Sequence, residues 1–537
     1  LSIGSVVGEF NATDLDINST LHYYLVAGAG DGNNSLFNLD INGTLKTATA
    51  FDYESNASTY TIRVQAKDEY NASVDTSFIV HLTNANDPPS GSVVLGGGAY
   101  SGEVLSVSDT LADQDGNVSV SYQWYRNGVP ISYGGTLKEG VDVTDGLEAL
   151  FGLAMSPDGA HFYITGYNDN AITWYDRNAT NGNLSYSGII KNGVGGISNL
   201  ANPFSLAVSP DGAHVYVTAF NDHAVHCFDR NASTGALTFS AMYQDGTAGV
   251  DGLNGAGQLV LSSEGDHLYV AGFGDNAIAR FDRNASTGVL TYQGMLQNNP
   301  PSVEGLSGAY GLVLSPDGHH AYATGYADNS IVWLDRNTTS GALSYGGKLV
   351  DGNNSVDGLA GAGWLTVSSD GKNVYATGTS DHAFAWFDRN ASTGALSFRG
   401  HLVDGVSGVD GLNGAQDVVV TSDGNFTYVS GSIDDAVGIF ERNASSGAPT
   451  FLKVLKYGGN SRLNGAGKML LSPNGAQLYV AAKDDNSISW FDRNPVTGSL
   501  LYFEGNESIY PTQPVDSNTT ITVIATYVDG LGNNETV

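Results

Sequence analysis

The sequence predicts an all-β protein in which a seven-bladed β-propeller is inserted into one β-sandwich and preceded by another. Two turns support this prediction because they recur with one period. A turn of the type Ser-Pro-Asp-Gly occurs seven times, and successive copies begin 53 residues apart, except that the last two begin 51 residues apart. The copies begin at Ser156, Ser209, Ser262, Ser315, Ser368, Thr421 and Ser472. A second turn, Asp-Arg-Asn or Glu-Arg-Asn, keeps the same phase at Asp176, Asp229, Asp282, Asp335, Asp388, Glu441 and Asp492. A fixed period of this size indicates a stacked or radial array.

Each repeat divides into four short segments of β-forming residues separated by turn residues. In the first repeat these segments are 151–155, 161–166, 171–175 and 184–190, and Gly, Pro, Asn and Asp cluster between them. Short runs bounded by such residues are typical of β-hairpins. Four strands in each of seven repeats predict seven propeller blades, an arrangement that leaves few sheet edges exposed.

The repeats resemble the lactonase-type propeller family, whose repeats are often called YVTN. The resemblance rests on Ser209–Thr218 and its copies, each followed by a segment like Asp229–Leu237, and it recurs in register over roughly residues 133–503. The family includes a sugar-phosphate lactonase and many non-enzymatic surface proteins. The resemblance therefore implies the fold of residues 133–504 and leaves the activity open.

The last blade is expected to be closed by residues from both ends of the propeller. Ile131–Gly140 matches the outer strand of a blade, as a comparison with Leu343–Gly352 shows. The chain then leaves after the third strand of the last repeat, near Arg493 to Leu500. We therefore expect residues near Ile131 to Lys138 to complete the blade of Gln477 to Asp492.

Residues 1–88 lack the 53-residue period and resemble a cadherin repeat. The resemblance rests on five motifs in order: Val6–Asp16, Leu39–Thr47, Phe51–Glu54, Val64–Asp68 and Asn84–Pro89. Cadherin repeats bind calcium at the joints between domains, and Ca²⁺ needs six to eight oxygen ligands. The resemblance thus implies a calcium-binding domain, whereas the alternative is that these acids are solvated surface residues.

The resemblance also implies which residues bind calcium. Asp14, Asp16 and Asp68 would face the joint to a preceding domain. Asp52, Glu54, Asn86 and Asp87 would face the joint to the next domain, together with Asp113 or Asp115.

Residues 89–132 resemble the first half of an immunoglobulin-like repeat of large bacterial surface proteins. The segments that carry this resemblance are Asp109–Gly116 and Val120–Ile131, and Trp124 would be the core tryptophan. The second half appears only after the propeller, in residues 505–537, as Gly505–Tyr510 and Thr520–Gly530. The propeller is therefore expected to be inserted into a loop of this sandwich, which requires that its two ends lie close together.

Composition narrows the classes of partner. The formal net charge is −33, and the sequence isoelectric point is about 4.3. Such a field repels nucleic acid and anionic membranes and attracts divalent cations. The sequence contains no run of 18 apolar residues, so no membrane span is expected. The chain starts at Leu1 without a visible signal peptide, which we interpret as a mature or excised segment. Cys227 is the single cysteine and is expected to be a packed strand residue.

Asn-x-Ser/Thr sequons are abundant and fall mostly in predicted turns, where a glycan would be solvated. Six of the seven Asp/Glu-Arg-Asn turns are sequons, whereas the seventh reads Asn494-Pro495. The sequence therefore predicts a secreted, N-glycosylated surface protein; the alternative is that Asn and Ser simply suit turns. The candidate sites are Asn11, Asn18, Asn33, Asn42, Asn56, Asn71, Asn117, Asn178, Asn183, Asn231, Asn284, Asn337, Asn353, Asn390, Asn425, Asn443, Asn506, Asn518 and Asn534.

The propeller itself shows no catalytic motif. An Asp recurs in the second hairpin turn of each blade, and we expect it to bond the amides of its own turn. These residues are Asp169, Asp222, Asp275, Asp328, Asp381, Asp434 and Asp485. The polar residues that break the repeat are His161, His223, His226, Arg280, His319, His320, His382 and Arg399. They do not assemble into a nucleophile, a base and an oxyanion site.

These observations favour an extracellular structural or adhesive protein, a calcium-stiffened and N-glycosylated piece of a surface fibre. Its partners would be copies of itself or adjacent domains joined head to tail, with surface carbohydrate or protein as further candidates, and neither nucleic acid nor a membrane. Two alternatives remain. One is a lactonase-like or carbohydrate-processing enzyme displayed on a stalk, and the other is a lectin-like propeller that binds sugar at its centre.

Overall fold

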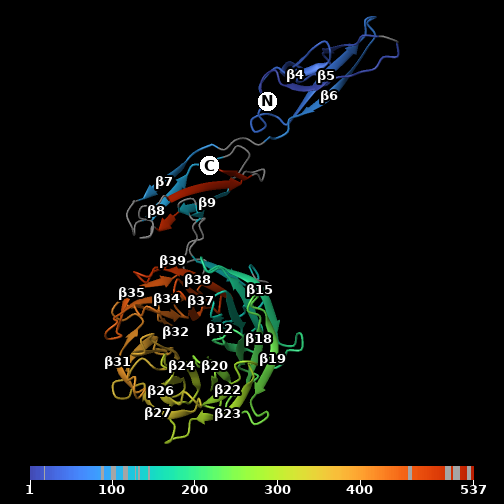
Figure 1. Ribbon diagram of the computed structural model, residues 1–537. Coiled ribbons are helices and arrows are strands. Elements are labelled where there is room, and N and C mark those ends of the chain that lie inside the picture. Colours follow the sequence, from blue (N-terminus) through green and yellow to red (C-terminus); the bar gives the residue numbers. More distant parts are fainter. Residues whose placement is uncertain are drawn as a thin grey trace. The chain divides into compact units, whose positions relative to one another are not determined.

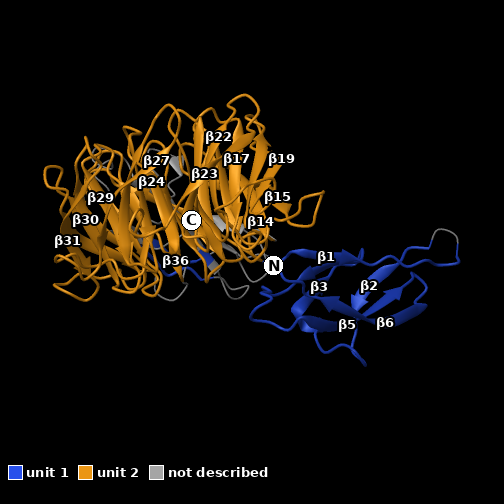
Figure 2. Cartoon of the chain, turned by 90° about the horizontal axis from the view of Figure 1, so that it is seen from below, with its two compact units in different colours: residues 1–131, 505–537 blue, residues 132–504 orange. Residues whose placement is uncertain are grey.

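The computed structural model divides the chain into two compact units, Leu1–Ile131 with Gly505–Val537 and Ser132–Glu504 (Figure 2). It describes the whole chain except residues 17–18, 86–89, 98–103, 113–118, 127–128, 131–133, 143–144, 457–462, 502–508, 512–520, 529–533 and 537. Among the described residues, no helix is long and apolar enough to cross a membrane.

The second unit is a ring of seven antiparallel sheets, six of them with four strands in sequence order (Figure 1). The innermost strands are β12 (Leu150–Met155), β16 (Pro203–Val208), β20 (Ala256–Leu261), β24 (Ala309–Leu314), β28 (Ala362–Val367), β32 (Ala415–Val420) and β36 (Ala466–Leu471). The second strands are β13 (His161–Gly166), β17 (His214–Ala219), β21 (His267–Gly272), β25 (His320–Gly325), β29 (Asn373–Gly378), β33 (Phe426–Gly431) and β37 (Gln477–Ala482). The repeated four-strand pattern of the sequence is thus confirmed.

The outer half of each sheet continues this order. The third strands are β14 (Ala171–Arg177), β18 (Ala224–Arg230), β22 (Ala277–Arg283), β26 (Ser330–Arg336), β30 (Ala383–Arg389), β34 (Ala436–Arg442) and β38 (Ser487–Arg493). The outer strands of the first six blades are β15 (Leu184–Lys191), β19 (Leu237–Gln244), β23 (Leu290–Gln297), β27 (Leu343–Val350), β31 (Leu396–Val403) and β35 (Pro449–Lys456).

The outer strand of the seventh blade is built from two separate pieces. β11 (Gly135–Lys138) pairs with Ser487–Trp490 of β38, as the sequence predicts, and β39 (Leu500–Leu501) pairs with Asp492 and Arg493. In the other six blades a β-bulge interrupts the pairing of the third and outer strands at this same place, for example between Trp174 and Tyr175. The outer strand of blade seven is therefore divided where the other blades carry the bulge, so both ends of the propeller segment contribute to ring closure.

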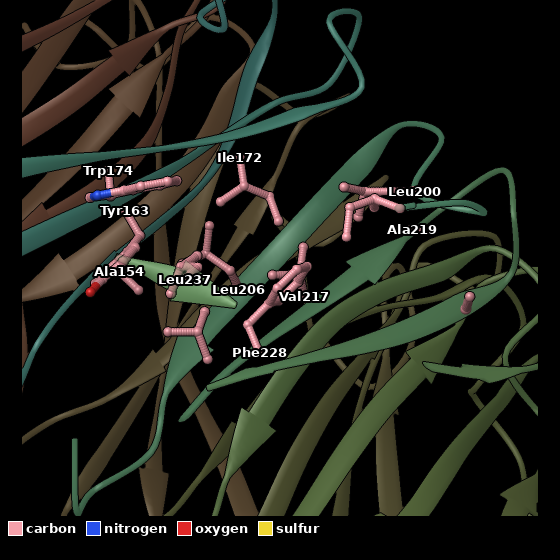
Figure 3. Packing of buried hydrophobic residues seen from close by; sticks show 13 residues of the cluster. Ala154, Tyr163, Ile172, Trp174, Leu200, Leu206, Val217, Ala219, Phe228 and Leu237 are labelled. Atoms are coloured by element: carbon pink, nitrogen blue, oxygen red, sulfur yellow. The ribbon is translucent and has the colours of Figure 1, made fainter. Parts of the chain in front are cut away.

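Neighbouring blades pack through the apolar faces of their sheets. Tyr163, Ile172 and Trp174 of the first blade contact Leu206, Val217 and Phe228 of the second (Figure 3). The residues of each second strand are buried throughout, because these strands lie inside a sheet that is covered on both faces. Leu147, Phe162 and Ile164 pack in the same way against Tyr479 and Trp490, which closes the ring between the first and last blades.

A buried arginine at the end of each third strand bonds two blades together. Arg283 donates to the Tyr216 hydroxyl (2.8 Å) and the Asp211 carboxylate (2.7 Å) of the preceding blade, and to the Gly265 carbonyl (3.0 Å) of its own. The equivalent residues are Arg177, Arg230, Arg336, Arg389, Arg442 and Arg493. Arg177 joins the first blade to the last through the Tyr479 hydroxyl (2.6 Å). Because a guanidinium presents five donors, one side chain can satisfy both blades at once.

Four of these arginines also bond a histidine of the preceding blade. Arg283 Nη2 lies 2.8 Å from Nδ1 of His214, which must be unprotonated to accept the bond. His161, His267 and His320 make the equivalent contact. Burial and the adjacent arginine lower the pKa of each of these histidines. His161 and His320 therefore have a structural role.

These histidines predict a loss of stability in mild acid. A histidine whose pKa is lower in the folded state takes up its proton more readily when unfolded, so stability falls as the pH drops below the ordinary value of 6.5. Asn373 occupies the same position in blade five and accepts from Arg442 (2.7 Å) without titrating. Replacing all four histidines by asparagine should flatten the dependence of the free energy of unfolding on pH below 7, as measured by urea denaturation. An equally steep dependence in the variant would contradict this explanation.

The first unit contains four small sheets. Residues near the N-terminus form β1 (Val6–Glu9), β2 (His22–Leu25), the 3₁₀ helix η1 (Asn34–Leu36), β3 (Phe37–Leu39), β4 (Thr44–Thr47), β5 (Thr59–Lys67) and β6 (Ser73–His81). The sheets β1-β4-β3 and β2-β5-β6 share one apolar core that includes Phe37, Phe51, Tyr60 and Ile62. The cadherin-like nature of this part stays a prediction.

The remaining strands join segments from both ends of the chain. They are β7 (Val93–Gly97), β8 (Val104–Asp109), β9 (Ser119–Arg126), β10 (Val129–Pro130), β40 (Ile509–Pro511), β41 (Ile521–Val528) and β42 (Asn534–Thr536). β9 pairs with β41 along its length, from Ser119 opposite Val528 to Arg126 opposite Ile521, and β8 pairs with β40. Residues before and after the propeller therefore share sheets, while the immunoglobulin-like assignment itself stays a prediction.

Candidate ligand-binding cup

A cavity of about 390 Å³ opens at one end of the propeller's central channel. The wall is formed by residues at two equivalent blade positions, the second residue of the innermost strand and the first residue after the second strand, and each blade contributes one or both of them. Blades one to four place aromatic side chains there, and we call these seven residues the aromatic cup: Phe151, Tyr167, Phe204, Phe220, Phe273, Tyr310 and Tyr326. Blades five to seven contribute Gly363, Thr379, Gln416 and Lys483 instead. The cavity therefore has one aromatic wall and one polar wall.

The rings of the aromatic cup touch one another in an unbroken series. Phe151 stacks on Phe204 with ring centroids 5.1 Å apart, and Phe204 lies 5.7 Å from both Phe220 and Tyr310. Phe273 continues the series to Tyr326 at 6.3 Å. Such contacts hold the rings at fixed positions, because tilted and stacked arrangements are each favourable by about 1 kcal/mol. The wall is thus pre-formed.

Trp364 packs behind two rings of the aromatic cup without lining the cavity, and we call its position the floor of the cup. It is the third residue of β28 and only 3 % exposed, whereas the first and fourth blades have Gly152 and Gly311 at this position. Its ring stacks on Phe204 at 5.9 Å and meets Tyr310 edge-on at 5.6 Å. Of the seven equivalent positions, this one holds a tryptophan, which fills the space that the glycines of the first and fourth blades leave open.

An ion pair lies against this floor. Lys468 Nζ sits 4.1 Å from the centre of the Trp364 ring and 3.2 Å from the Asp417 carboxylate. Asp417 is 1 % exposed and also accepts the backbone N–H of Met469 (2.8 Å). Ser205 and Gln258, at the same position of other blades, each accept an equivalent N–H of the next blade. Asp417 therefore keeps a contact of the repeat and adds a charge that Lys468 neutralises.

The groups that could contact a ligand are mainly neutral. Burial raises the pKa of the Tyr310 hydroxyl above its ordinary value, so this phenol stays protonated and able to donate a hydrogen bond. Lys483 is the charged residue of the wall, and its ammonium bonds the Asp484 carboxylate at 2.7 Å. The cup can therefore stack a ligand ring against its aromatic wall and form hydrogen bonds with the polar edge of that ring. Among the described residues that line the cup, none has a carboxylate or an imidazole that could act as a general base.

The Asp that recurs in each blade has a structural role, but not the one expected. It does not bond only its own turn: it accepts a backbone N–H from the loop that precedes the blade, 21 residues earlier, as Asp222 does from Ala201 (2.6 Å). All seven blades repeat this bond. The next residue, in the left-handed region, accepts an N–H of the following blade, as His223 does from Gly255 and His382 from Gly414. These histidines therefore hold loops together.

Three carboxylates converge at this turn in four blades, with oxygens within 4.8 Å of one another. The groups are Glu139, Asp145 and Asp169; Asp245, Asp251 and Asp275; Asp351, Asp357 and Asp381; and Asp404, Asp410 and Asp434. A lysine at the end of the outer strand neutralises two of them, Lys191 against Asp145 (2.8 Å) and Lys456 against Asp410 (2.7 Å). Burial and the two neighbouring acids raise the pKa of Asp275, which has no such lysine. Among the described residues, these groups of carboxylates are the sites best suited to bind a hard cation.

Adding the missing lysine should stabilise the third blade. Gln297 ends β23 at the position of Lys191 and Lys456. Gln297→Lys is expected to raise the free energy of unfolding by about 0.5–1 kcal/mol, because a partly exposed ion pair stabilises a protein by about this amount. The control is Gln244→Lys in blade two, where Asn192 and Ser198 replace two of the acids, and it should gain less. Equal effects of the two substitutions in thermal or urea denaturation would contradict the charge argument.

The predicted calcium ligands are only partly described. Asn86, Asp87, Asp113 and Asp115 lie outside the described residues. Asp68 is buried in its hairpin, where it accepts the N–H groups of Tyr70 and Ala72, and Asp14 bonds Asp16 N–H and the Ser19 hydroxyl. Asp52 and Glu54 both line a cavity of about 500 Å³ that also contains Ala85. Neither set is among the converging groups found in the described part of the chain.

The other polar residues that break the repeat do not converge either. Buried His226 bonds the Ser198 carbonyl (2.9 Å), Arg280 bonds the Ser340 carbonyl (2.6 Å) and Arg399 contacts the Asp388 carboxylate (2.5 Å). His319 lies in an exposed turn. Cys227 is fully buried, which raises the pKa of its thiol to about 11 and makes it unreactive. The residues of the aromatic cup were not predicted from the sequence, although they depart from the repeat at two fixed positions.

Comparisons with known proteins agree with this fold. The family described as lactonase, seven-bladed β-propeller, matches residues 136–250, 205–301 and 385–514. A putative 6-phosphogluconolactonase of Bacteroides uniformis is 21% identical over 63% of this chain and 94% of its own, with a TM-score of 0.49. A periplasmic gluconolactonase of Pseudomonas aeruginosa is 16% identical over 68% and 96%, with a TM-score of 0.48.

Another solved β-propeller is also similar to this chain. The Cps50 (Swd1) β-propeller domain of Myceliophthora thermophila is 13% identical over 67% of this chain and 100% of its own, with a TM-score of 0.50. No curated protein matches the sequence. At 13% identity the similarity to this domain indicates the propeller fold alone.

Proposed function

We propose that this chain, which belongs to the lactonase family of seven-bladed β-propellers, binds a ring-shaped carbohydrate in the aromatic cup. The observation that carries the proposal is the two-sided wall, aromatic over blades one to four and polar over blades five to seven. A pyranose or a sugar lactone has the same division, with apolar C–H faces and a polar edge of hydroxyls. A cavity of about 390 Å³ lies within the range of small-molecule sites and holds one or two such rings.

The geometry supports the recognition of such a ring more directly than its turnover. Opening a lactone requires a water or a nucleophile activated by a base, and a group that stabilises the oxyanion. Lys483 could supply the last of these, but its ammonium is bonded to Asp484. The carboxylate nearest the floor, Asp417, is buried and paired with Lys468. Hydrolysis of a sugar lactone is the second candidate, and the family membership favours it.

An extracellular structural or adhesive role remains a proposal for the whole chain. Exposed sequons and the position of Asp52 and Glu54 on one cavity support the proposed glycosylation and calcium binding. A carbohydrate-binding propeller suits such a surface protein, because it provides the adhesive contact. Joining with copies of itself head to tail is likewise proposed.

Fluorescence and calorimetry can test the binding proposal. Hexopyranoses and hexonolactones added to the full chain should change the emission of Trp364, since any ligand in the cup lies on its neighbours Phe204 and Tyr310. Trp364→Phe should lose that change while calorimetry still records binding. Acid release from the lactones, measured in the same samples, would favour the second candidate. Absence of heat and of any emission change across the panel would refute both.

A further inference from the structure

We propose that six asparagines on one face of the propeller carry N-linked glycans that form an incomplete ring. They occupy one equivalent position in blades one to six and are all exposed: Asn178, Asn231, Asn284, Asn337, Asn390 and Asn443. Each follows a third strand. Because successive strands alternate in direction, these turns lie on the propeller face opposite the loops that surround the aromatic cup.

The asparagine itself is needed by the turn. Asn231 Oδ1 accepts the N–H of Ser233 (2.9 Å) and of Thr234 (3.1 Å), and the other five repeat this pair of bonds. These bonds use only the amide oxygen. The Nδ2 groups of these six residues make no hydrogen bond within the described structure, so they are available at the surface.

The hydroxyl two residues later has no such structural role. It belongs to exposed residues whose side chains form no hydrogen bond in the described parts of the chain: Thr180, Ser233, Ser286, Thr339, Ser392 and Ser445. The seventh blade shows that the turn forms without it. There Val496 occupies the position and is 78 % exposed, yet Asn494 Oδ1 still accepts the N–H groups of Val496 (2.9 Å) and Thr497 (3.0 Å).

Folding therefore explains the asparagine but not the hydroxyl, and the two together form a glycosylation sequon. In the modification, Nδ2 forms a bond to the anomeric carbon of a lipid phosphate-linked oligosaccharide. The bond from that carbon to the phosphate oxygen breaks, the lipid phosphate leaves, and the amide loses one proton.

The gap in the ring coincides with a special blade. Asn494 is followed by Pro495 and Val496, so it lacks both requirements of a sequon. Blade seven is also the one whose outer strand is divided between β11 and β39, where the chain enters and leaves the propeller. The arrangement would coat the turn face around blades one to six and leave blade seven bare, whereas the separate sequon at Asn353 lies on the other face, in the loop after β27.

Glycopeptide mass spectrometry of the full chain, secreted from an N-glycosylating eukaryotic host, tests this proposal. We expect glycans on most of the six asparagines and none on Asn494. Pro495→Ala combined with Val496→Ser should add a glycan at Asn494, because it completes a sequon in a turn where the Asn494 Oδ1 accepts the same two N–H groups, although Asn494 is only partly exposed. Bare asparagines in blades one to six, or a double variant that folds but stays unmodified, would overturn the proposal.

A second variant separates modification from folding. Ser392→Ala should lose the glycan at Asn390 only. After enzymatic removal of all glycans, the variant and the parent should have the same melting temperature, because the Ser392 hydroxyl forms no hydrogen bond with any residue that the structure describes. A lower melting temperature of the deglycosylated variant would show that the hydroxyl is structural and would remove the argument. Neither outcome depends on whether the cup binds carbohydrate.

Discussion

Replacing Asp417 with alanine is expected to lower the free energy of unfolding of the propeller by about 3 kcal/mol, because Lys468 would lose its partner beneath the cup. The Met469 N–H would also lose its acceptor. Denaturant unfolding, followed by far-ultraviolet circular dichroism, measures the change. The environment of the Trp364 ring should change together with the stability, because Lys468 lies over that ring.

A double variant separates the charge from the hydrogen bond. Asp417→Gln keeps an acceptor at this position, as Gln258 does in blade three, and Lys468→Met removes the ammonium. Together they should recover most of the stability, because replacing a buried ion pair by neutral groups of similar size is often neutral. If Asp417→Ala unfolds like the parent protein, Asp417 does not hold the floor of the cup.

Removing two rings from the aromatic cup should weaken carbohydrate binding at least about tenfold, which corresponds to about 1.4 kcal/mol. Phe220→Thr with Phe273→Thr gives blades two and three the residue that blade five has as Thr379. The propeller already tolerates threonine there, so the variant should fold. Tyr186→Thr on the exposed outer strand β15 is the matched control and should bind like the parent. Calorimetric titration measures both, and equal affinities would exclude the aromatic wall.

The sequence predicted the propeller because its turns repeat, and turns have strong local preferences. The residue types and spacing of the turns at Ser156 and its copies are sufficient to predict the first hairpin of each blade. The contribution of β11 to the last blade was predictable for the same reason, as Ile131–Gly140 matches another outer strand. The sequence did not predict that β39 forms the second piece of that outer strand, because two residues, Leu500 and Leu501, are too few to form a recognisable pattern.

The cup was harder to predict because its residues are ordinary strand residues. Phe204 and Tyr310 are apolar and lie in buried strands, so nothing local distinguishes them from core residues such as Phe162. Only closure of the ring brings blades one to four together around one cavity. Likewise, the sequence did not show that His161 and His320, at the same position of two blades, each accept a bond from an arginine of the next blade.

A crystal structure of the protein with the tightest-binding hexopyranose or hexonolactone tests the central claim most directly. We predict one sugar ring in the cup, with a C–H face against the aromatic residues and hydroxyls within hydrogen-bonding distance of Thr379, Gln416 or Lys483. A sugar bound elsewhere on the propeller, with the cup holding only solvent, would contradict the account.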